Sequence, residues 1–571
     1  MKGLVEPHGG ALVELLAPEA EREQLRRKAV SLASWELTGR QLCDLELLMN
    51  GAFSPLTGFM GRADYERVVR EMRLASGLLW PIPVTLDVSE ELARSLESGS
   101  NLVLRDPEGV PLAVLEVTDL WRPDRGFEAR AVYGTEDTTH PGVDALLLRS
   151  HPCYVGGRIV GIEAPQHFDF VDCRLTPREV REHFARLGWR RVVAFQTRNP
   201  MHRAHVELTL QAARAAEANI LLHPVVGLTK PGDINHYARV HCYQKVLRHY
   251  PEGAATLALL PLSMRMAGPR EALLHAIVRK NYGCTHFIIG RDHAGPGKDT
   301  AGGDFYPPYA AQELALAHQK ELGIGILPFQ EMVYVEERAE YAASDRVAPG
   351  ERVLAISGTE FRRRLDRGLE IPAWFSYPEV VAELQRTQPA RDRQGVTVFF
   401  TGLSGAGKST IAKALLARLL EVGERSVTLL DGDVVRKHLS SELGFSRAHR
   451  DLNIQRIGYV ASEITKHRGI ALCAPIAPFA ATRAEVRRMI SEWGGFFEVY
   501  VSTPIDVCEA RDRKGMYAKA RAGLIQSFTG VSDPYEVPEH PELAIDTRDC
   551  TPLEAAAMIL TRLETEGYVG G

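Results

Sequence analysis

The chain has 571 residues, of which 45% are hydrophobic and 25% charged, the balance of a globular protein long enough for several domains. Its 68 lysines and arginines against 73 aspartates and glutamates leave a formal net charge of −5, which excludes a strong global field for nucleic acid or an anionic membrane. No run of about 18 uncharged apolar residues and no secretory signal is present, so we expect no membrane association. Eight cysteines without a Cys-x-x-Cys pair predict reduced thiols in a cytoplasm.

Residues 1–170 contain short apolar runs separated by Gly, Pro and Asp turns. Examples of such runs are residues 80–88, 101–105 and 112–117. Runs of this length with turn residues between them are typical of β-strands, so we expect a β-rich, barrel-like or α+β domain.

The pattern changes near residue 171. Residues 191–195, 220–226 and 285–289 predict buried parallel strands with helices between them, which is the signature of an α/β sheet over residues 171–330. We assign residues 331–386 to a small α/β subdomain and the polar, aperiodic residues 387–395 to a linker. A fresh α/β pattern begins at Val396 and defines a last domain over residues 396–571.

A phosphate-binding loop follows the first strand of that last domain. The segment fits the pattern G-x-x-x-x-G-K-[ST] and lies between a strand ending at Phe400 and a helical run that stops at Gly423. Backbone N–H groups of such a loop close around phosphates, while the lysine reaches the β- and γ-phosphates and the serine hydroxyl ligates Mg²⁺. The predicted ATP-binding residues are Gly402, Leu403, Ser404, Gly405, Ala406, Gly407, Lys408, Ser409 (also the Mg²⁺ ligand) and Thr410.

Two carboxylates, Asp431 and Asp433, follow the next predicted strand. Beside a phosphate loop they could hold Mg²⁺ or a substrate hydroxyl. They could equally be a helix N-cap followed by a solvated turn.

In the first α/β region, two polar loops follow predicted strands, at residues 196–205 and 290–297. Loops at the carboxyl ends of parallel strands define a crevice for a ligand. His202 and His205 lie three residues apart at a predicted helix start, so they face the same way. This pair allows three interpretations: a metal site, a buried structural pair, or recognition of a departing pyrophosphate at a helix N-terminus.

The C-terminal motifs at 402–409, 431–436, 443–446, 450–454, 514–521 and 528–530 resemble adenylylsulfate (APS) kinase over residues 395–571. The resemblance implies that Asp433 orients or deprotonates the 3′-hydroxyl of APS, that Phe445 and Phe528 sandwich its adenine, and that Lys514 sits on a mobile lid. It places further APS contacts at Arg436, Arg450, Asn453, Ile476, Ala477 and Thr529. Two departures from the family pattern are His449, where many members have Asp, and Ala477, where serine is usual.

Residues 1–385 are similar to ATP sulfurylase, through the two polar loops and the segments 37–46, 53–60, 328–333 and 356–362. The resemblance implies a PUA-like barrel, then a Rossmann-like nucleotidyltransferase domain. It assigns sulfate binding to Gln196, Arg198 and the backbone N–H of Ala294. It assigns the ATP site to Gln196, Thr197, Arg198, Asn199, His202, His205, Gly290, Arg291, Asp292, His293 and Val333. Some relatives carry zinc; because residues 295–345 contain no cysteine, we expect none.

Together these resemblances predict a cytoplasmic, homo-oligomeric enzyme of two steps. ATP and sulfate give APS and pyrophosphate, and ATP with APS then gives 3′-phosphoadenylyl sulfate (PAPS) and ADP, with Mg²⁺ accompanying ATP. Thr197, Arg198, Asn199, His202, His205, Lys408 and Asp433 are the expected catalytic residues. One alternative is a sulfurylase with a regulatory, non-catalytic C-terminal domain, as in fungal enzymes of this domain order that have lost the phosphate loop. A nucleotide-dependent scaffold is another, but it leaves two complete active-site sets unexplained.

Overall fold

The computed structural model describes residues 3–230, 233–423, 425–512, 515–525 and 527–569. It divides into two compact units, Met1–Ile356 with Pro372–Glu383, and Ser357–Ile371 with Leu384–Gly571. Lys514, the predicted lid residue, lies outside the described residues. None of the helices in the described ranges is long and apolar enough to cross a membrane.

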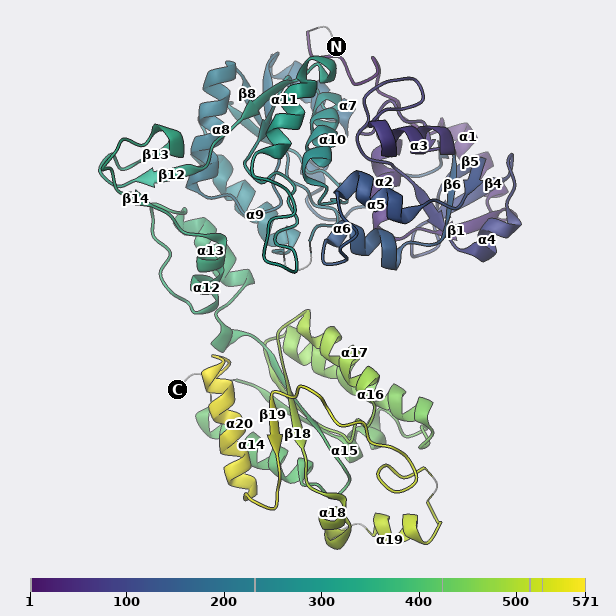
Figure 1. The fold of residues 1–571 in the computed structure, drawn as a ribbon, viewed down its shortest axis with the longest axis vertical. Coiled ribbons are helices and arrows are strands. Elements are labelled where there is room, and N and C mark those ends of the chain that lie inside the picture. Colours follow the sequence, from purple (N-terminus) through teal and green to yellow (C-terminus); the bar gives the residue numbers. More distant parts are fainter. Residues whose placement is uncertain (1–2, 231–232, 424, 513–514, 526, 570–571) are drawn as a thin grey trace. The chain divides into compact units, whose positions relative to one another are not determined.

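The N-terminal region is a mixed sheet with helices at its edges (Figure 1). Its elements are α1 (Glu19–Lys28), β1 (Ala33–Glu36), α2 (Gly39–Met49), β2 (Gly58–Phe59), α3 (Arg62–Glu71), β3 (Leu86–Val88), α4 (Glu90–Ser95), β4 (Asn101–Arg105), β5 (Pro111–Trp121), α5 (Arg125–Tyr133), α6 (Pro141–Asp144) and β6 (Cys153–Gly161). The strand order is β1-β4-β5-β6-β2, with β3 also on β6. The expected barrel is therefore not closed, because β1 and β2 lie at opposite ends of this order within the described residues.

The run at residues 80–88 was expected to be one strand, but only Leu86–Val88 pairs with β6. Pro81 and Pro83 lack the N–H that a ladder needs, so they delay the start of the strand. The start of helix α2, by contrast, is explained by a local capping motif. Thr38 accepts from the backbone N–H of Gln41, whose side chain returns a bond to Thr38, and this capping box starts α2.

The second region is a parallel, doubly wound sheet. Its elements are α7 (Pro177–Arg186), β7 (Val192–Phe195), α8 (Arg203–Ala216), β8 (Asn219–Leu222), α9 (His236–Val246), β9 (Ala255–Leu257), α10 (Gly268–Asn281), β10 (His286–Ile289), α11 (Ala310–Leu322) and β11 (Gly325–Pro328). The order β11-β10-β7-β8-β9 reverses direction between β7 and β10. Ligands of such sheets bind outside the carboxyl ends of the strands at this switch point.

The strand expected at residues 220–226 ends at Leu222, because Pro224 cannot donate to the ladder; beyond it Val225 forms only an isolated bridge to Leu260. One hydrophobic core joins this sheet to the N-terminal one. It contains Leu115 of β5, Phe287 of β10 and Leu273 of α10, all fully buried.

A small antiparallel sheet follows, with β12 (Met332–Val335) between β13 (Glu340–Ala343) and β14 (Val353–Leu354). Then come α12 (Gly358–Asp366) and α13 (Pro378–Thr387). Residues 357–371, which contain α12, group with the C-terminal unit, whereas residues 372–383 group with the N-terminal unit.

The C-terminal unit is a second parallel sheet, ordered β16-β17-β15-β18-β19. Its elements are β15 (Val396–Thr401), α14 (Lys408–Val422), β16 (Val427–Asp431), α15 (Gly432–His438), α16 (Arg447–Lys466), β17 (Ile470–Ala474), α17 (Ala480–Ser491), β18 (Gly495–Val501), α18 (Ile505–Arg511), α19 (Met516–Arg521), β19 (Leu543–Ile545) and α20 (Pro552–Thr565). Successive residues of β15 face opposite ways: Val398 packs with α14 and α20, and Phe399 with α16 and α17. The two helix pairs therefore cover opposite faces (Figure 1).

Candidate active sites

In the N-terminal unit, the structure brings the two predicted polar loops together at the switch point. They follow the neighbouring strands β7 and β10, which pair in parallel. The loops meet where Nη2 of Arg198 lies 3.5 Å from the carbonyl oxygen of Gly295. Residues after β8 reach the same place, since Nζ of Lys230 donates to the carbonyl of Pro296 over 2.8 Å. Three loops therefore meet around Arg198, at the edge of the sheet where ligands of such folds bind.

Arg198 itself is held by a carboxylate that the sequence did not single out. Its Nη1 lies 2.6 and 2.7 Å from the two carboxylate oxygens of Asp233, and the two side chains are only 19% and 13% exposed. Because both oxygens bind one nitrogen, the rest of the guanidinium fork stays available for an anion. Beneath the loop, Arg239 donates to the carbonyls of Arg198 and Val225, which fixes the backbone.

His202 and His205 form the cap of α8. His202 is the N-cap residue, and its backbone N–H donates to Nδ1 of His205 over 3.1 Å. The His202 ring packs on Phe375, and its Nδ1 lies 2.9 Å from Oγ of Ser376. Burial lowers the pKa of His202 to about 3 and that of His205 to about 4, so both imidazoles are neutral at pH 7. The pair thus has a structural role in the helix cap, and it faces the ligand side of the sheet as an uncharged group.

Thr197 and Asn199 shape the turn between them. The Thr197 hydroxyl accepts from the backbone N–H of Asn199 over 3.0 Å, and the hydroxyl of Tyr243 donates to the Asn199 carbonyl over 2.8 Å. Among the described residues, the Gln196 amide has one weak polar contact, with the sulfur of Met264 at 3.9 Å. Gln196 is therefore available to a ligand.

The loop after β10 is compressed around Gly295. A Cβ there would lie 1.9 Å from Oδ1 of Asp292, so any larger residue would have to displace the Asp292 carboxylate. Ala294 has φ +54°, a left-handed conformation that is uncommon for alanine and typical of functional sites. Gly290 lies in this loop after β10 and Val333 lies in β12, and Arg291 pairs with Glu331 just before that strand at 3.4 Å.

In the C-terminal unit, the phosphate loop has the predicted strand–loop–helix setting. Gly402, Gly405 and Gly407 have φ values of +145°, +76° and +111°, which only glycine adopts without strain. Lys408 begins α14, and its Nζ donates to the carbonyls of Gly402 and Leu403 over 2.9 and 2.7 Å. The ammonium group is therefore held across the mouth of the loop.

Three hydroxyls that sequence reasoning missed clamp this loop from outside. Thr503 and Thr547 donate to the carbonyl of Ala406, and Tyr517 donates to that of Ser404. Their positions, about 100 residues or more from the loop, carry no local motif. The loop is thus fixed before any phosphate arrives.

Asp431 and Asp433 have different roles in the structure. Asp431 is the N-cap of α15, and its side chain accepts from the backbone N–H of Asp433 over 3.0 Å. The N-cap interpretation therefore holds for Asp431. Asp433 is exposed in the first turn of α15, where its carboxylate can reach a ligand.

The predicted APS residues gather around Phe479 and the segment after α19. Arg450 lies 5.3 Å from the Phe479 ring and donates to Thr529 and Asp533. Oδ1 of Asn453 is buried and has no hydrogen-bond partner in the described structure, so it can accept from a ligand. Ile476 and Ala477 lie after β17 and receive bonds from the Thr401 hydroxyl through their carbonyls.

The two predicted adenine-stacking rings differ in exposure. Phe445 is 55% exposed with Arg436 over its ring at 4.6 Å, whereas Phe528 is buried against Tyr517. His449, the departure from the family pattern, accepts from the backbone N–H of Gly444 over 2.9 Å. It therefore shapes the turn that carries Phe445.

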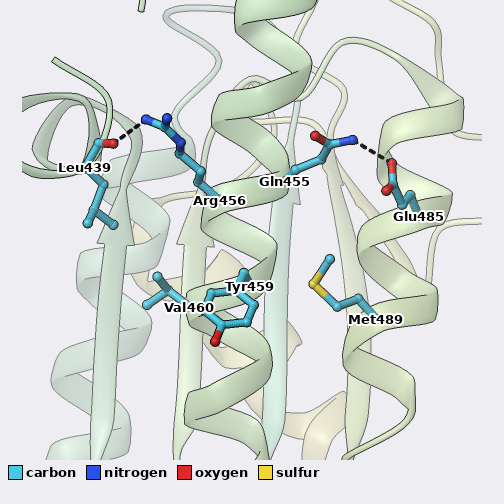
Figure 2. A pocket seen from close by; sticks show the side chains of 7 residues that line it. All are labelled: Leu439, Gln455, Arg456, Tyr459, Val460, Glu485 and Met489. Carbon is cyan, nitrogen blue, oxygen red and sulfur yellow. Dashed lines mark hydrogen bonds between the residues drawn. The ribbon is translucent and has the colours of Figure 1, made fainter. Parts of the chain in front are cut away.

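Two hollows lie on the C-terminal unit. One, of about 620 Å³, borders the phosphate loop at Leu403 and extends along residues 530–535. The other, of about 570 Å³, lies over α16 and α17 and contains no predicted site residue; its lining is Leu439, Gln455, Arg456, Tyr459, Val460, Glu485 and Met489 (Figure 2). The first is thus the hollow that adjoins the predicted chemistry.

Polar loops at the switch point of one sheet, followed by a phosphate loop on a second sheet, are the arrangement of an enzyme that acts on nucleotides in two domains. Family models agree: residues 5–164 match a PUA-like domain, 171–387 ATP-sulfurylase, and 394–546 adenylylsulphate kinase. The chain is 53% identical to a sulfate adenylyltransferase of Phaeosphaeria nodorum and 52% identical to one of Neurospora crassa, each over 99% of both chains. It also superposes on a structure titled hexameric APS kinase from Thiobacillus denitrificans, with a TM-score of 0.81 and 44% identity over 99% of this chain and 100% of that one.

The chain therefore belongs to the sulfate adenylyltransferase family, and its adenylylsulphate kinase domain makes it a bifunctional enzyme. This agrees with the predicted sulfate activation and not with a regulatory C-terminal domain.

Proposed function

We propose that the residues at the two sites divide the work of sulfate activation between them. The observation that carries this proposal is the intact phosphate loop with Lys408 at the start of α14, in a chain that also holds Arg198 at the switch point. Each site has its own cation for a phosphate or sulfate group, on its own sheet.

In the first step, Arg198, Gln196 and the backbone N–H of Ala294 bind sulfate. Sulfate is already an oxyanion, so its attack on the α-phosphorus of ATP needs no general base. The site instead has to hold two anions together and stabilise the departing pyrophosphate. Neutral His202 and His205 are suited to stabilising pyrophosphate, because each imidazole can donate one hydrogen bond. A charged side chain would form an ion pair with pyrophosphate and slow its release. Thr197, Asn199, Gly290, Arg291, Asp292, His293 and Val333 line the rest of the ATP site.

In the second step, Lys408 neutralises the β- and γ-phosphates of a second ATP, and Asp433 positions the 3′-hydroxyl of APS. Mg²⁺ enters with ATP; the hydroxyl of Ser409, in the first turn of α14, is a hard oxygen ligand of the kind this ion prefers. The cation supplies charge neutralisation at the phosphates. Because transfer depends on alignment more than on covalent chemistry, the rigid loop is the main catalytic device.

We assign APS binding to Arg436, Arg450, Asn453, Ile476, Ala477, Phe445, Phe528 and Thr529. The orphaned Oδ1 of Asn453 supports this assignment, since a buried acceptor without a partner is costly unless a ligand completes it. Lys514 remains a predicted lid residue.

We further propose a cytoplasmic homo-oligomer with the bacterial arrangement, sulfurylase first and an active kinase second. All eight cysteines are free of disulfides, which suits a reducing compartment. The hexameric relative from Thiobacillus denitrificans supports self-association. The absence of zinc, nucleic-acid and membrane partners stays a prediction.

One experiment tests the two steps together. The protein is supplied with ATP, Mg²⁺ and sulfate, and the nucleotides are separated by chromatography. PAPS and ADP should appear, with APS as the intermediate. APS without PAPS would contradict the kinase assignment, and ATP hydrolysis without APS would leave only the scaffold alternative.

A further inference from the structure

Two buried side chains of α10 connect to a histidine of the loop after β10. Glu271 lies in the first turn of α10 and His275 one turn later, and both are fully buried. Nε2 of His275 lies 3.4 Å from Oε1 of Glu271, an electrostatic contact without hydrogen-bond geometry, and Nδ1 of His275 is hydrogen-bonded to Nε2 of His293 over 2.9 Å. The chain thus connects the helix to a residue of the predicted ATP site. None of the reaction steps described above uses Glu271 or His275.

The charges in this chain are fixed by its surroundings. Burial alone would raise the pKa of Glu271, but His275 and the backbone N–H groups of Arg265 and Ala267, each 2.9 Å away, lower it overall. Burial lowers the pKa of His275 by more than the neighbouring Glu271 raises it, and burial with the nearby His275 and Arg279 lowers the pKa of His293. At neutral pH Glu271 is therefore a carboxylate and both imidazoles are neutral.

These charges determine where each proton lies. A neutral imidazole carries one N–H, and a carboxylate can only accept. A bare nitrogen at Nε2 would oppose its lone pair to the Glu271 carboxylate 3.4 Å away, so the His275 proton lies on Nε2 and its Nδ1 is bare. His293 must then donate from Nε2 to that bare nitrogen, which leaves Nδ1 of His293 without a proton.

We propose that Glu271 and His275 are positioning residues that present His293 as a hydrogen-bond acceptor, and that His293 recognises the nucleoside half of ATP. At neutral pH the donors on ATP are its ribose hydroxyls and adenine amino group, whereas the phosphate oxygens accept. This inference rests on the proposed place of His293 in the sulfurylase ATP site.

The first test is whether His293 contacts the nucleoside. His293→Ala should raise KM for ATP in the forward direction and for APS in the reverse direction by about tenfold, the worth of one good hydrogen bond. The KM of pyrophosphate, which has no nucleoside, should stay within about twofold. Unchanged KM values for ATP and APS would remove His293 from the site, and both this inference and that part of the proposed function would fall.

The second test compares two replacements of His275. The side-chain oxygen of asparagine can stand where Nδ1 stands and accept from His293; leucine fills the space but cannot accept. We expect His275→Leu to reproduce the KM changes of His293→Ala, and His275→Asn to stay within about threefold of wild type. A merely structural role predicts the reverse order, since leucine suits a buried position better than asparagine. Equal effects, or a more active leucine variant, would overturn the positioning role alone.

The third test reverses the direction of hydrogen-bond donation between residue 271, His275 and His293. In Glu271→Gln an amide N–H in the place of Oε1 gives up the bond from Arg265 and faces Nε2 of His275, which moves the His275 proton to Nδ1 and makes His293 a donor at Nδ1. KM for ATP and APS should again rise about tenfold. On a His293→Ala background, Glu271→Gln should add less than a twofold change. An additive effect would show that Glu271 acts by another route.

Matched controls separate this effect from damage to the fold. His286→Asn changes the same residue type at the other end of β10, where Nδ1 contacts only the neighbouring Thr285 hydroxyl, and should leave every KM unchanged. PAPS formation from added APS, measured on the same samples, should be unchanged in all variants. Melting curves confirm that each variant is folded, and if Glu271→Gln does not fold, the His275 pair decides the question.

Discussion

Replacing Arg198 by alanine removes the cation around which the sulfate site is built. The side chain now makes two contacts of 2.6 and 2.7 Å to Asp233, and its remaining donors are the ones assigned to sulfate. A hydrogen bond to a charged group contributes about 1.5–3 kcal/mol, and each 1.36 kcal/mol is a factor of ten in rate. Because the cation also counters the repulsion between two anions, we expect kcat/KM for sulfate to fall by at least about 100-fold.

The same substitution leaves the carboxylate of Asp233 without its arginine partner. Removing one partner of a buried ion pair costs roughly 3–5 kcal/mol, and since these side chains remain 19% and 13% exposed we expect about 2 kcal/mol. For a unit of this size that lowers the melting temperature by roughly 2–3 °C. Arg198→Ala combined with Asp233→Asn should recover most of that loss and none of the activity.

The assay is sulfate-dependent pyrophosphate exchange, with PAPS formation from added APS as the control in the other unit. Exchange should collapse in both Arg198 variants while the kinase step stays near wild type. Exchange within threefold of wild type in Arg198→Ala would refute the sulfate assignment. Exchange restored by adding Asp233→Asn would show instead that the stranded carboxylate, and not the missing cation, causes the defect.

Three further predictions concern the kinase and the response to acid. Lys408→Ala or Asp433→Asn should reduce PAPS formation at least about 100-fold while APS synthesis continues, because the two sites lie on separate sheets. Ala477 has no hydroxyl, so PAPS formation should proceed with inversion at the γ-phosphorus and without a phosphoenzyme. Acidification from pH 6.5 toward 4 should destabilise the N-terminal unit. Burial lowers the pKa of several histidines in the folded state to about 3 or 4. In this pH range the unfolded chain therefore binds protons that the folded chain does not bind. Each such histidine costs about 1.4 kcal/mol per pH unit; they are His8, His140, His202 and His205.

Each of these three predictions has an outcome that would contradict it. PAPS formation by Lys408→Ala would end the kinase assignment. Retention of configuration, or label from γ-labelled ATP on a C-terminal peptide that APS discharges, would reveal a nucleophile other than residue 477. A melting temperature of the N-terminal unit that is constant between pH 7 and 5 would mean that the histidines are not held neutral.

The strands and the phosphate loop could be predicted because their signals are local. Val396–Thr401 is a continuous apolar run, and the glycines after it need backbone angles that other residues avoid. Where the prediction was wrong, proline explains it: Pro83 and Pro224 stand in apolar runs and end the pairing there. The open N-terminal sheet could not be foreseen, because strand closure depends on partners far apart in the chain.

The site residues that sequence reasoning missed share one property. Asp233, Glu271 and His275 act on Arg198 and His293 from other elements, across 18 or more positions of sequence, and none belongs to a recognisable motif. An aspartate in a polar loop and a histidine inside a helix are ordinary in any sequence. Only the folded structure shows that Asp233 contacts the guanidinium group of Arg198 and that Glu271 lies beside the imidazole of His275.

The two sites solve the problem of repelling anions in different ways. At the kinase site the charge is in place before the phosphates bind, since the ammonium group of Lys408 is held by carbonyls of its own loop. At the sulfurylase site Arg198 is balanced by Asp233, and His202 and His205 are neutral. A balanced site binds its two anionic substrates less tightly, but it also releases pyrophosphate, which a cluster of bare cations would retain. We therefore infer that the neutral histidines serve turnover, and that replacing His205 by lysine would lower KM for pyrophosphate while slowing its release.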